Sequence, residues 1–155
     1  MRTLDEVTGT IIESAVKIHR TLGPGLLESV YETVLARDLE RRGFAILRQR
    51  PVSFEYDGMK FRRGFQYDLL VEGCVLLEIK SLERLAPVHG KQLLTYLRLM
   101  NLHLGLLLNF GETTMKEGIH RVVNNLPPSA SPALRVNAAS SRGGAETAEK
   151  NDNRR

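Results

Sequence analysis

The stretch from Tyr67 to Lys80 places three charged residues inside two otherwise apolar runs. Each run has the length and the aliphatic content of a β-strand, and Glu72-Gly73 between them is typical of a turn, so the stretch predicts a β-hairpin. A sheet buries charged side chains only where they pair with each other, contact water or bind a metal ion. Asp68, Glu78 and Lys80 therefore restrict what this hairpin can be.

The register of the hairpin decides whether the two carboxylates can meet. Side chains alternate between the faces of a strand, so Glu78 and Lys80 share one face. A three-residue loop with Gly73 in the left-handed conformation would add Asp68 to that face, whereas a two-residue turn would send it to the opposite one. A shared site for the carboxylates therefore requires the three-residue loop.

Two carboxylates that converge with a lysine suit Mg²⁺-dependent hydrolysis of phosphodiester bonds. Mg²⁺ takes oxygen ligands and needs only one or two carboxylates beside water and substrate phosphate, which Asp68 and Glu78 would supply, with the Ile79 carbonyl as a further ligand. Lys80 would position the metal-activated hydroxide or offset charge in the transition state. The alternative is a surface salt bridge between Glu78 and Lys80 on the exposed face of an edge strand.

A helix is predicted from Val88 to Met100, because apolar residues recur there at helical spacing and Asn101 is a suitable stop. Gln92 and Tyr96 are four residues apart and therefore lie on one face of this helix. Taken alone, the pair fits a core tyrosine and a solvated glutamine.

These motifs follow one another in a recognisable order. Asp68, Glu78-Ile79-Lys80 and Gln92-Leu93-Leu94-Thr95-Tyr96 resemble the motif series of the PD-(D/E)XK nuclease superfamily, in the RecB-like branch that has a Gln-x-x-x-Tyr helix. Gly25-Leu26-Leu27-Glu28-Ser29-Val30-Tyr31 resembles the signature of the small GxxExxY proteins, which are assigned to the same superfamily. The likeness runs from about Val7 to Asn124.

The resemblance implies a restriction-endonuclease-like core and a nuclease that uses Mg²⁺ or Mn²⁺, with nucleic acid, and DNA in particular, as its partner. It makes Glu28, Asp68, Glu78 and Lys80 catalytic. The metal ligands would be Asp68, Glu78, Glu28 and the Ile79 carbonyl. The supporting or nucleic-acid-binding residues would be Tyr31, Arg84, Lys91, Gln92 and Tyr96. The chain departs from the family at Gly90-Lys91, where the family has Glu-Ala, although Lys91 could still meet a phosphate.

The periodicity of the remaining chain predicts an α/β arrangement with two N-terminal helices. Gly23-Pro24-Gly25 separates these helices, and Gly43 suits the end of the second one. Alternating residues from Phe44 to Phe65 predict strands around the Asp57-Gly58 turn. The runs 104–110 and 119–123 predict a buried strand and an edge strand. Together these elements give a mixed β-sheet flanked by helices.

A length of 155 residues with 42% hydrophobic content favours a single domain. We expect a nuclease-like domain over residues 1–126 and a disordered low-complexity tail over residues 127–155, which is rich in small and charged residues. The net charge of +4 is split evenly between them, so bulk charge does not indicate nucleic-acid binding. Two local basic clusters are candidates for phosphate contacts. They are Arg41, Arg42, Arg48 and Arg50, and Lys60, Arg62 and Arg63.

The single cysteine, Cys74, excludes an intramolecular disulfide and a zinc cluster, and His89 is expected to have a capping or structural role. A leader pattern and an apolar run of membrane-spanning length are both missing from the sequence, so we expect a cytoplasmic protein without a membrane partner. Two other classes of function stay open. One is a non-cleaving nucleic-acid-binding module, and the other is a subunit that binds a second copy or another protein.

Overall fold

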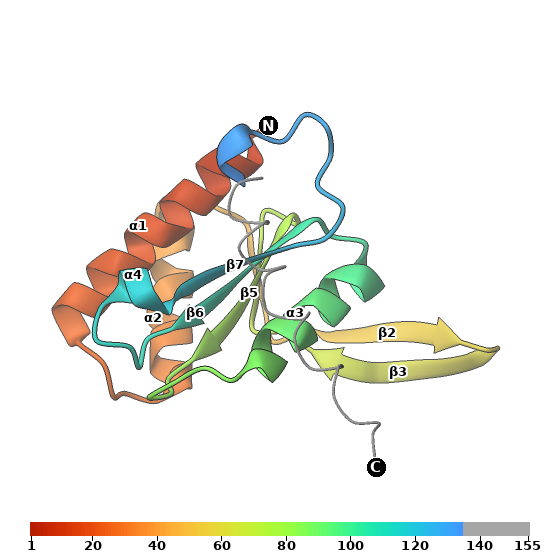
Figure 1. Ribbon diagram of the computed structural model, residues 1–155, viewed down its shortest axis with the longest axis horizontal. Coiled ribbons are helices and arrows are strands. Elements are labelled where there is room, and N and C mark those ends of the chain that lie inside the picture. The colour runs from red at the N-terminus through yellow and green to blue at the C-terminus, as the bar shows by residue number, and fades with distance from the viewer. Residues whose placement is uncertain (135–155) are drawn as a thin grey trace, which may run out of the picture.

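The computed structural model describes residues 1–134, and in it helices lie on both sides of a five-stranded sheet (Figure 1). The helices are α1 (Leu4–Leu22), α2 (Glu28–Arg41), α3 (Pro87–Met100) and α4 (Met115–Gly118). The strands are β1 (Ile46–Arg48), β2 (Pro51–Tyr56), β3 (Met59–Gln66), β4 (Leu69–Val71), β5 (Val75–Lys80), β6 (Leu104–Asn109) and β7 (Ile119–Val123).

The five strands are arranged in the order β1-β4-β5-β6-β7, and β5 is the central one. β5 and β6 are parallel, with α3 as the connection between them, whereas the other neighbouring pairs are antiparallel. The predicted mixed sheet flanked by helices, with two N-terminal helices, is therefore confirmed. The fold is consistent with a restriction-endonuclease-like core.

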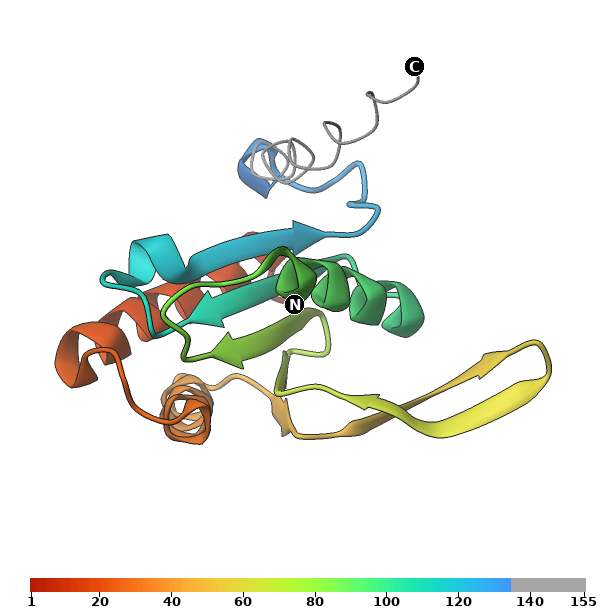
Figure 2. The same ribbon diagram turned by 60° about the horizontal axis from the view of Figure 1, so that its bottom comes forward.

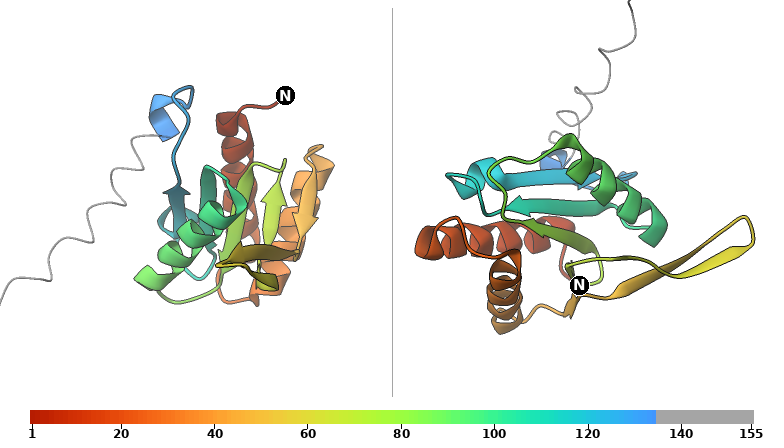
Figure 3. Two further views of the ribbon diagram at one scale, coloured as in Figure 1. Left: turned by 90° about the vertical axis from the view of Figure 1, so that its right-hand side faces the viewer. Right: turned by 90° about the horizontal axis from the view of Figure 1, so that it is seen from below.

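The two faces of the sheet are covered unequally (Figures 2 and 3). The face that packs on α1 and α2 is called the closed face, and it holds Val75, Leu77 and Ile79 in the larger hydrophobic cluster. The face that packs on α3 is called the open face, and Leu76 there joins a smaller cluster with Leu93 and others. Successive residues of β5 therefore serve opposite sides of the molecule.

The hairpin of β2 and β3 forms a separate two-stranded sheet rather than extending the central one. Its predicted turn is confirmed, because Tyr56 pairs with Met59 and both Asp57 and Gly58 have positive φ angles. The hairpin projects away from the body of the molecule beyond α3 (Figures 1 and 3). Alternation alone predicted strands here but could not assign them to a sheet, since it is the same in either sheet.

The packed part of the chain continues past β7. Leu134 is 1% exposed and belongs to the core cluster of the closed face, with Leu126 and Ala130 packed against it. The remainder of the expected tail, residues 135–155, lies outside the described residues. Over residues 1–134, no helix combines the length and the apolar character needed to cross a membrane.

Candidate active site

The loop between β4 and β5 has the three-residue form that a shared carboxylate site requires. Val71 pairs with Val75, which leaves Glu72, Gly73 and Cys74 in the loop, and Gly73 has a φ of +64°. Leu69 pairs with Leu77 in this antiparallel register, so the residue before Leu69, which is Asp68, lies opposite the residue after Leu77, which is Glu78. The two carboxylates therefore stand side by side on the open face.

Glu78 is a buried carboxyl group, with a relative exposure of 7%. Its Oε1 atom is buried and has no hydrogen-bond partner among the described residues. Burial raises the pKa of Glu78 to about 8, and the Asp68 carboxylate adds to this effect while the Lys80 ammonium opposes it. A buried carboxyl group without a hydrogen-bond partner for one oxygen is stabilised in its ionised form when a cation binds to it.

The alternative of a surface salt bridge on an edge strand is wrong for Glu78 and Lys80. β5 lies between β4 and β6, so it is a central strand. Glu78 and Lys80 are not among the salt bridges formed within residues 1–134. Lys80 is half-buried at the end of the strand and shares the face of Glu78.

Asp68 is fixed by two hydrogen bonds. Its Oδ2 atom accepts a hydrogen bond from the Ile79 backbone N–H at 2.7 Å, and its Oδ1 atom accepts one from Gln49 Nε2 at 3.1 Å. Gln49 Nε2 also donates to Glu32 Oε2 at 2.6 Å, so one amide joins α2 to the carboxylate of Asp68. The backbone of Gln49 adopts a φ of +48°, which is unfavourable for a residue with a side chain.

The Ile79 carbonyl is directed toward the same region. The N–H and C=O of one strand residue point to the same side, and the N–H of Ile79 points to Asp68. The carbonyl of Lys80 points to β6, where it accepts a hydrogen bond from Phe110 N at 2.8 Å. The β4 pairing begins at Leu69, so the Ile79 carbonyl lies beyond the paired region and next to the carboxylates.

The α3 residues border this region with different degrees of exposure. Burial raises the pKa of Tyr96, and the Glu78 and Asp68 carboxylates add to this effect, so its hydroxyl group is near both. The Tyr96 ring stacks on Phe65 with ring centroids 4.0 Å apart. Lys91 and Gln92 are exposed on α3, and Arg84 is exposed on the loop that precedes it.

His89 has the predicted structural role at the start of α3, because its Nδ1 atom accepts a hydrogen bond from the Ala86 N–H at 3.0 Å. Gly90 does not interrupt the helix, which runs from Pro87 through Met100 and ends at Asn101 in the left-handed conformation. The predicted helix from Val88 to Met100 is therefore confirmed to within one residue at its start.

Tyr31 supports the entry to α2. Its side chain is fully buried and stacks on Phe110 at 4.4 Å, while its hydroxyl group donates to the Gly23 carbonyl and accepts from Leu26 N–H at 3.1 Å. A fully buried ring cannot contact nucleic acid, so of the two roles foreseen for Tyr31 the supporting one fits its position. Ser81 Oγ donates to the Leu26 carbonyl at 2.6 Å, which ties this entry loop to the end of β5.

Glu28 and Glu32 lie one turn apart on α2 but differ in their exposure. Glu28 is exposed on the first turn, and residues 1–134 contain no group of three or more His, Cys, Asp or Glu side chains that could hold a metal ion. Glu28 therefore does not join Asp68 and Glu78 as a third acid in this structure. Glu32, one turn further along α2, is 7% exposed and accepts hydrogen bonds from Arg48 and Gln49. The partners come from β1 and its exit, which sequence spacing could not reveal.

Two further residues at the site were not identified from the sequence. Gln49 carries no local motif, and its role follows from its contacts alone. Asn109 is fully buried at the end of β6, and it bonds to both Leu82 N and Leu82 O at 2.9 Å, which holds the loop leading to Arg84. A polar residue that ends a fully apolar strand was the available signal for Asn109.

The two basic clusters differ in how many of their charges are free. Arg42 bonds to Asp38 and Glu13, and Arg48 bonds to Glu32, so both have structural partners. Lys60, Arg62 and Arg63 are exposed on β3 and take part in none of the salt bridges within residues 1–134.

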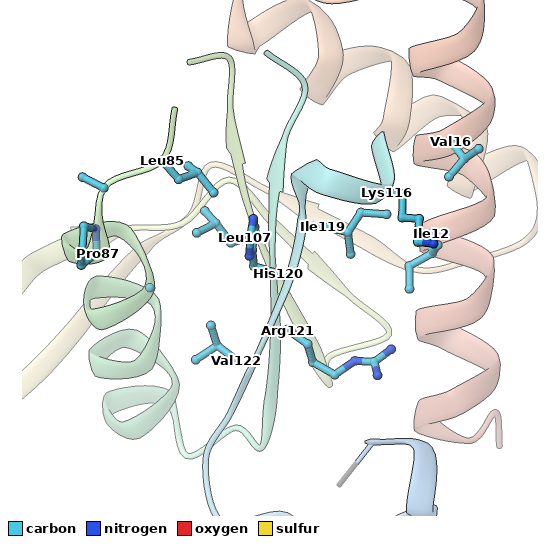
Figure 4. Close-up of a pocket in the computed structure, with 12 residues that line it drawn as sticks. Ile12, Val16, Leu85, Pro87, Leu107, Lys116, Ile119, His120, Arg121 and Val122 are labelled. Carbon is cyan, nitrogen blue, oxygen red and sulfur yellow. The ribbon is translucent and has the colours of Figure 1, made fainter. Parts of the chain in front are cut away.

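A pocket of about 900 Å³ lies away from the carboxylates (Figure 4). It surrounds β7, with Ile12 and Val16 of α1 on one side and Pro87 at the start of α3 on the other. None of the predicted site residues lines it. This cavity is therefore separate from the carboxylate pair.

The residues at the carboxylate pair fit a hard divalent cation. Asp68 and Glu78 offer carboxylate oxygens, one of which is buried without a partner, and the Ile79 carbonyl adds a third oxygen beside them. Oxygen ligands in this small number suit Mg²⁺ or Mn²⁺, which keep several water molecules or substrate oxygens in their coordination shell.

Comparison with protein families gives a match to the PD-(D/E)XK nuclease superfamily over residues 5–122. No curated protein and no solved structure matches the chain. The matched residues contain all four catalytic candidates and the whole five-stranded sheet except its last residue.

Proposed function

Because the chain belongs to the PD-(D/E)XK nuclease superfamily, we propose that it is a Mg²⁺- or Mn²⁺-dependent nuclease that hydrolyses phosphodiester bonds of DNA. The observation that carries the proposal is the buried, unpartnered Glu78 oxygen beside the Asp68 carboxylate. The 25–31 motif and the Gln92/Tyr96 pair support a finer position near the GxxExxY proteins and the RecB-like branch.

In this proposal Asp68, Glu78 and the Ile79 carbonyl hold the metal ion. Glu28 would join this ligand set only once the ion is bound, because it is exposed on α2 and is not grouped with Asp68 and Glu78 in this structure. The entry loop of α2 is joined to the end of β5 by the Ser81–Leu26 hydrogen bond. When bound, the ion would acidify a water molecule and neutralise charge on the scissile phosphate. The ion would also relieve the repulsion between the Asp68 and Glu78 carboxylates, because it would take the place of the proton that Glu78 otherwise retains.

Lys80 stabilises the charge that develops on the phosphate in the transition state. Its stem extends along the open face from Leu76, and its ammonium group is free of salt bridges to the described residues. Lys91 and Gln92 are exposed on α3 and Arg84 on the loop before it, and in this proposal they position the substrate backbone. Tyr96 borders the carboxylates and limits the access of water.

The test is cleavage of linear, nicked, branched and single-stranded DNA, and of matching RNA, with Mg²⁺ or Mn²⁺, beside a Lys80→Met variant. We expect metal-dependent cleavage by the wild type and a rate about 10²-fold lower for Lys80→Met, because a transition-state charge contact is lost while packing is kept. Lys116→Met, at an exposed lysine of α4, serves as the matched control and should cleave normally.

Two results would contradict the nuclease proposal. One is a purified wild-type protein that cleaves no nucleic acid with either metal, and the other is a Lys80→Met variant that cleaves at the wild-type rate. Nucleic-acid binding that is indifferent to metal would then favour a non-cleaving binding module that keeps the nuclease fold.

A further inference from the structure

The β2–β3 hairpin is a structural element without a covering layer along most of its length. It stands outside the central sheet and extends beyond α3 (Figures 2 and 3). A two-stranded hairpin on its own is only marginally stable in water, because one ribbon cannot bury a hydrophobic face. Its composition therefore needs an explanation outside the core of the molecule.

The outer half of the hairpin has one apolar face. Strand alternation and the pairs Phe54–Phe61 and Tyr56–Met59 set these four side chains on one face, and the pairing register shifts between them and the Val52–Phe65 pair at the base. At the base, Val52 packs against the open-face cluster and Phe65 stacks on Tyr96. Toward the tip, the face is uncovered, since Tyr56 is 70% exposed, Met59 53% and Phe61 41%.

The aromatic side chains of this face are held in place within the hairpin itself. Phe54 and Phe61 stack with ring centroids 4.9 Å apart. The Phe54 ring also covers Gly64 so closely that a Cβ atom at this position would lie 2.1 Å from it. The rings therefore form a fixed surface, and binding to it requires little ordering of side chains.

The charges on the hairpin favour an anionic partner. Lys60, Arg62 and Arg63 are exposed on β3 and are not neutralised by salt bridges within residues 1–134, whereas Glu55 and Asp57 are the hairpin's only acids. Lys60 and Arg62 alternate with Met59 and Phe61 along β3, so they extend from the opposite face of the narrow ribbon. Exposed aromatic rings flanked by cations suit unpaired nucleic-acid strands, whose bases stack while their phosphates bind the cations.

The base of the hairpin is connected to the carboxylate pair. Gln66, the last residue of β3, donates a hydrogen bond to Gln49 Oε1, and Gln49 donates to Asp68. Phe65 stacks on Tyr96, which lies near Glu78 and Asp68. A strand bound along the hairpin would therefore meet the two carboxylates at the hairpin's base.

We propose that the β2–β3 hairpin is a nucleic-acid-binding arm that stacks the bases of an unpaired strand on Tyr56 and Phe61 and binds its phosphates through Lys60 and Arg62. The direction of the strand toward Asp68 and Glu78 rests on the proposed nuclease function. The binding of the strand to the hairpin does not rest on it.

The first test measures binding without cleavage. Fluorescence anisotropy with labelled oligothymidylate in EDTA compares the wild type with a Tyr56→Ala/Phe61→Ala variant. We expect the affinity to fall about 10-fold or more, because two stacking surfaces are lost. Leu22→Ala/Val34→Ala removes comparably exposed apolar side chains from α1 and α2 and should bind like the wild type.

The second test uses charge changes that leave the aromatic face untouched, in case the alanine variant does not fold. Lys60→Gln/Arg62→Gln should reduce the slope of log affinity against log salt by about 0.7 for each lost phosphate contact on a single strand. Arg20→Gln/Arg37→Gln removes two exposed arginines from α1 and α2 and should leave the slope unchanged. Annealing the oligothymidylate to its complement should weaken binding, because its bases are then paired.

Several outcomes would overturn the proposal. Wild-type affinity in both hairpin variants is one, and equal binding of the duplex and the single strand is another. A wild-type dimer that Tyr56→Ala/Phe61→Ala dissociates, with nucleic-acid affinity unchanged, would make the hairpin a self-association surface. Hairpin-dependent binding in a protein that cleaves nothing would support the arm while the nuclease proposal fails.

Discussion

The closed face and the open face of the sheet use the same strand for different purposes. On β5, Leu77 and Ile79 point into the closed face and are at most 1% exposed, while Glu78 and Lys80 point to the open face between and beyond them. Two helices, α1 and α2, cover the closed face, whereas one helix, α3, lies on the open face, with Val52 of the hairpin base packed beside it (Figure 3). Stability and reactive groups are thus separated by the alternation of a single strand.

The helix α3 covers the open face over most of β5 and leaves it uncovered only toward the end of that strand. α3 approaches the sheet closely because Gly105 has no side chain, and a Cβ atom there would lie 3.0 Å from Leu93. Leu93 and Leu97 seal this part of the face with Leu76 and Leu107. Toward the end of β5 the apolar cover stops, and the polar side chains begin there. The difference shows that one helix is enough to fix the strand but leaves room for a ligand.

The largest expected effect is on stability and comes from the closed face. Leu77→Ala should lower the free energy of unfolding by about 2–5 kcal/mol, because it opens a cavity in a fully buried cluster. Lys80→Met on the same strand should change it by less than about 1 kcal/mol, since Lys80 is half-buried and unpaired. Urea denaturation of both variants tests the contrast. A loss of similar size for both would show that the faces are not separate.

A second prediction concerns the pH dependence that Glu78 gives to the metal-free protein. The pKa of Glu78 is raised from 4.5 to about 8, so between these values the folded state holds a proton that the unfolded state has released. The contribution of Glu78 to stability is therefore greatest below pH 4.5 and falls as the pH rises toward about 8, by up to about 1.4 kcal/mol per pH unit. Glu78→Gln should remove this decline, because a glutamine side chain does not titrate.

The measurement is the free energy of unfolding by urea in EDTA at several pH values between 5 and about 9, a window set by the same pKa change. Glu55→Gln, an exposed acid on the hairpin, is the control and should keep the wild-type decline. Equal slopes for wild type and Glu78→Gln would show that Glu78 is ionised in the folded protein.

The sequence predicted those features of the site that depend on neighbouring residues. The hairpin and its two possible registers followed from the sequence, and the loop of Glu72, Gly73 and Cys74 is the three-residue form that brings Asp68 and Glu78 to one face. The helix carrying Gln92 and Tyr96 followed from its apolar spacing. Both depend on contacts within a short stretch of chain, which a sequence pattern records.

The features that the sequence did not predict depend on distant contacts. Glu32 is buried because Arg48 and Gln49, contributed by β1 and its exit, reach back to α2. Glu28 occupies the signature position, yet the first turn of α2 leaves it exposed. The separate hairpin is a third case, since its alternation suits any sheet. In each case the burial of the residue or the placement of the strand depends on contacts with residues distant in sequence, which a local sequence pattern does not record.

A third prediction addresses metal binding to the open face. Because Asp68 and Glu78 repel each other without a cation, Mg²⁺ or Mn²⁺ should stabilise the folded state by about 1.4 kcal/mol at tenfold excess over the dissociation constant. Differential scanning calorimetry at about pH 8, where Glu78 is half ionised, measures the rise in Tm. Asp68→Asn should reduce the rise, and EDTA should reverse it. An unchanged Tm at saturating metal would exclude a metal site at these carboxylates.

The smallest expected effect separates positioning from folding at Gln49. Its amide joins Glu32 to Asp68, and its φ of +48° is strained for any residue with a Cβ atom. Gln49→Ala should lose about 1 kcal/mol of stability and slow cleavage several-fold, because Asp68 loses a hydrogen bond. Gln49→Gly relieves the strain, so it should be about 1 kcal/mol more stable than Gln49→Ala and yet cleave equally slowly. Denaturation and single-turnover cleavage of both variants test this, and recovery of cleavage in Gln49→Gly would show that the backbone, rather than the amide, positions Asp68.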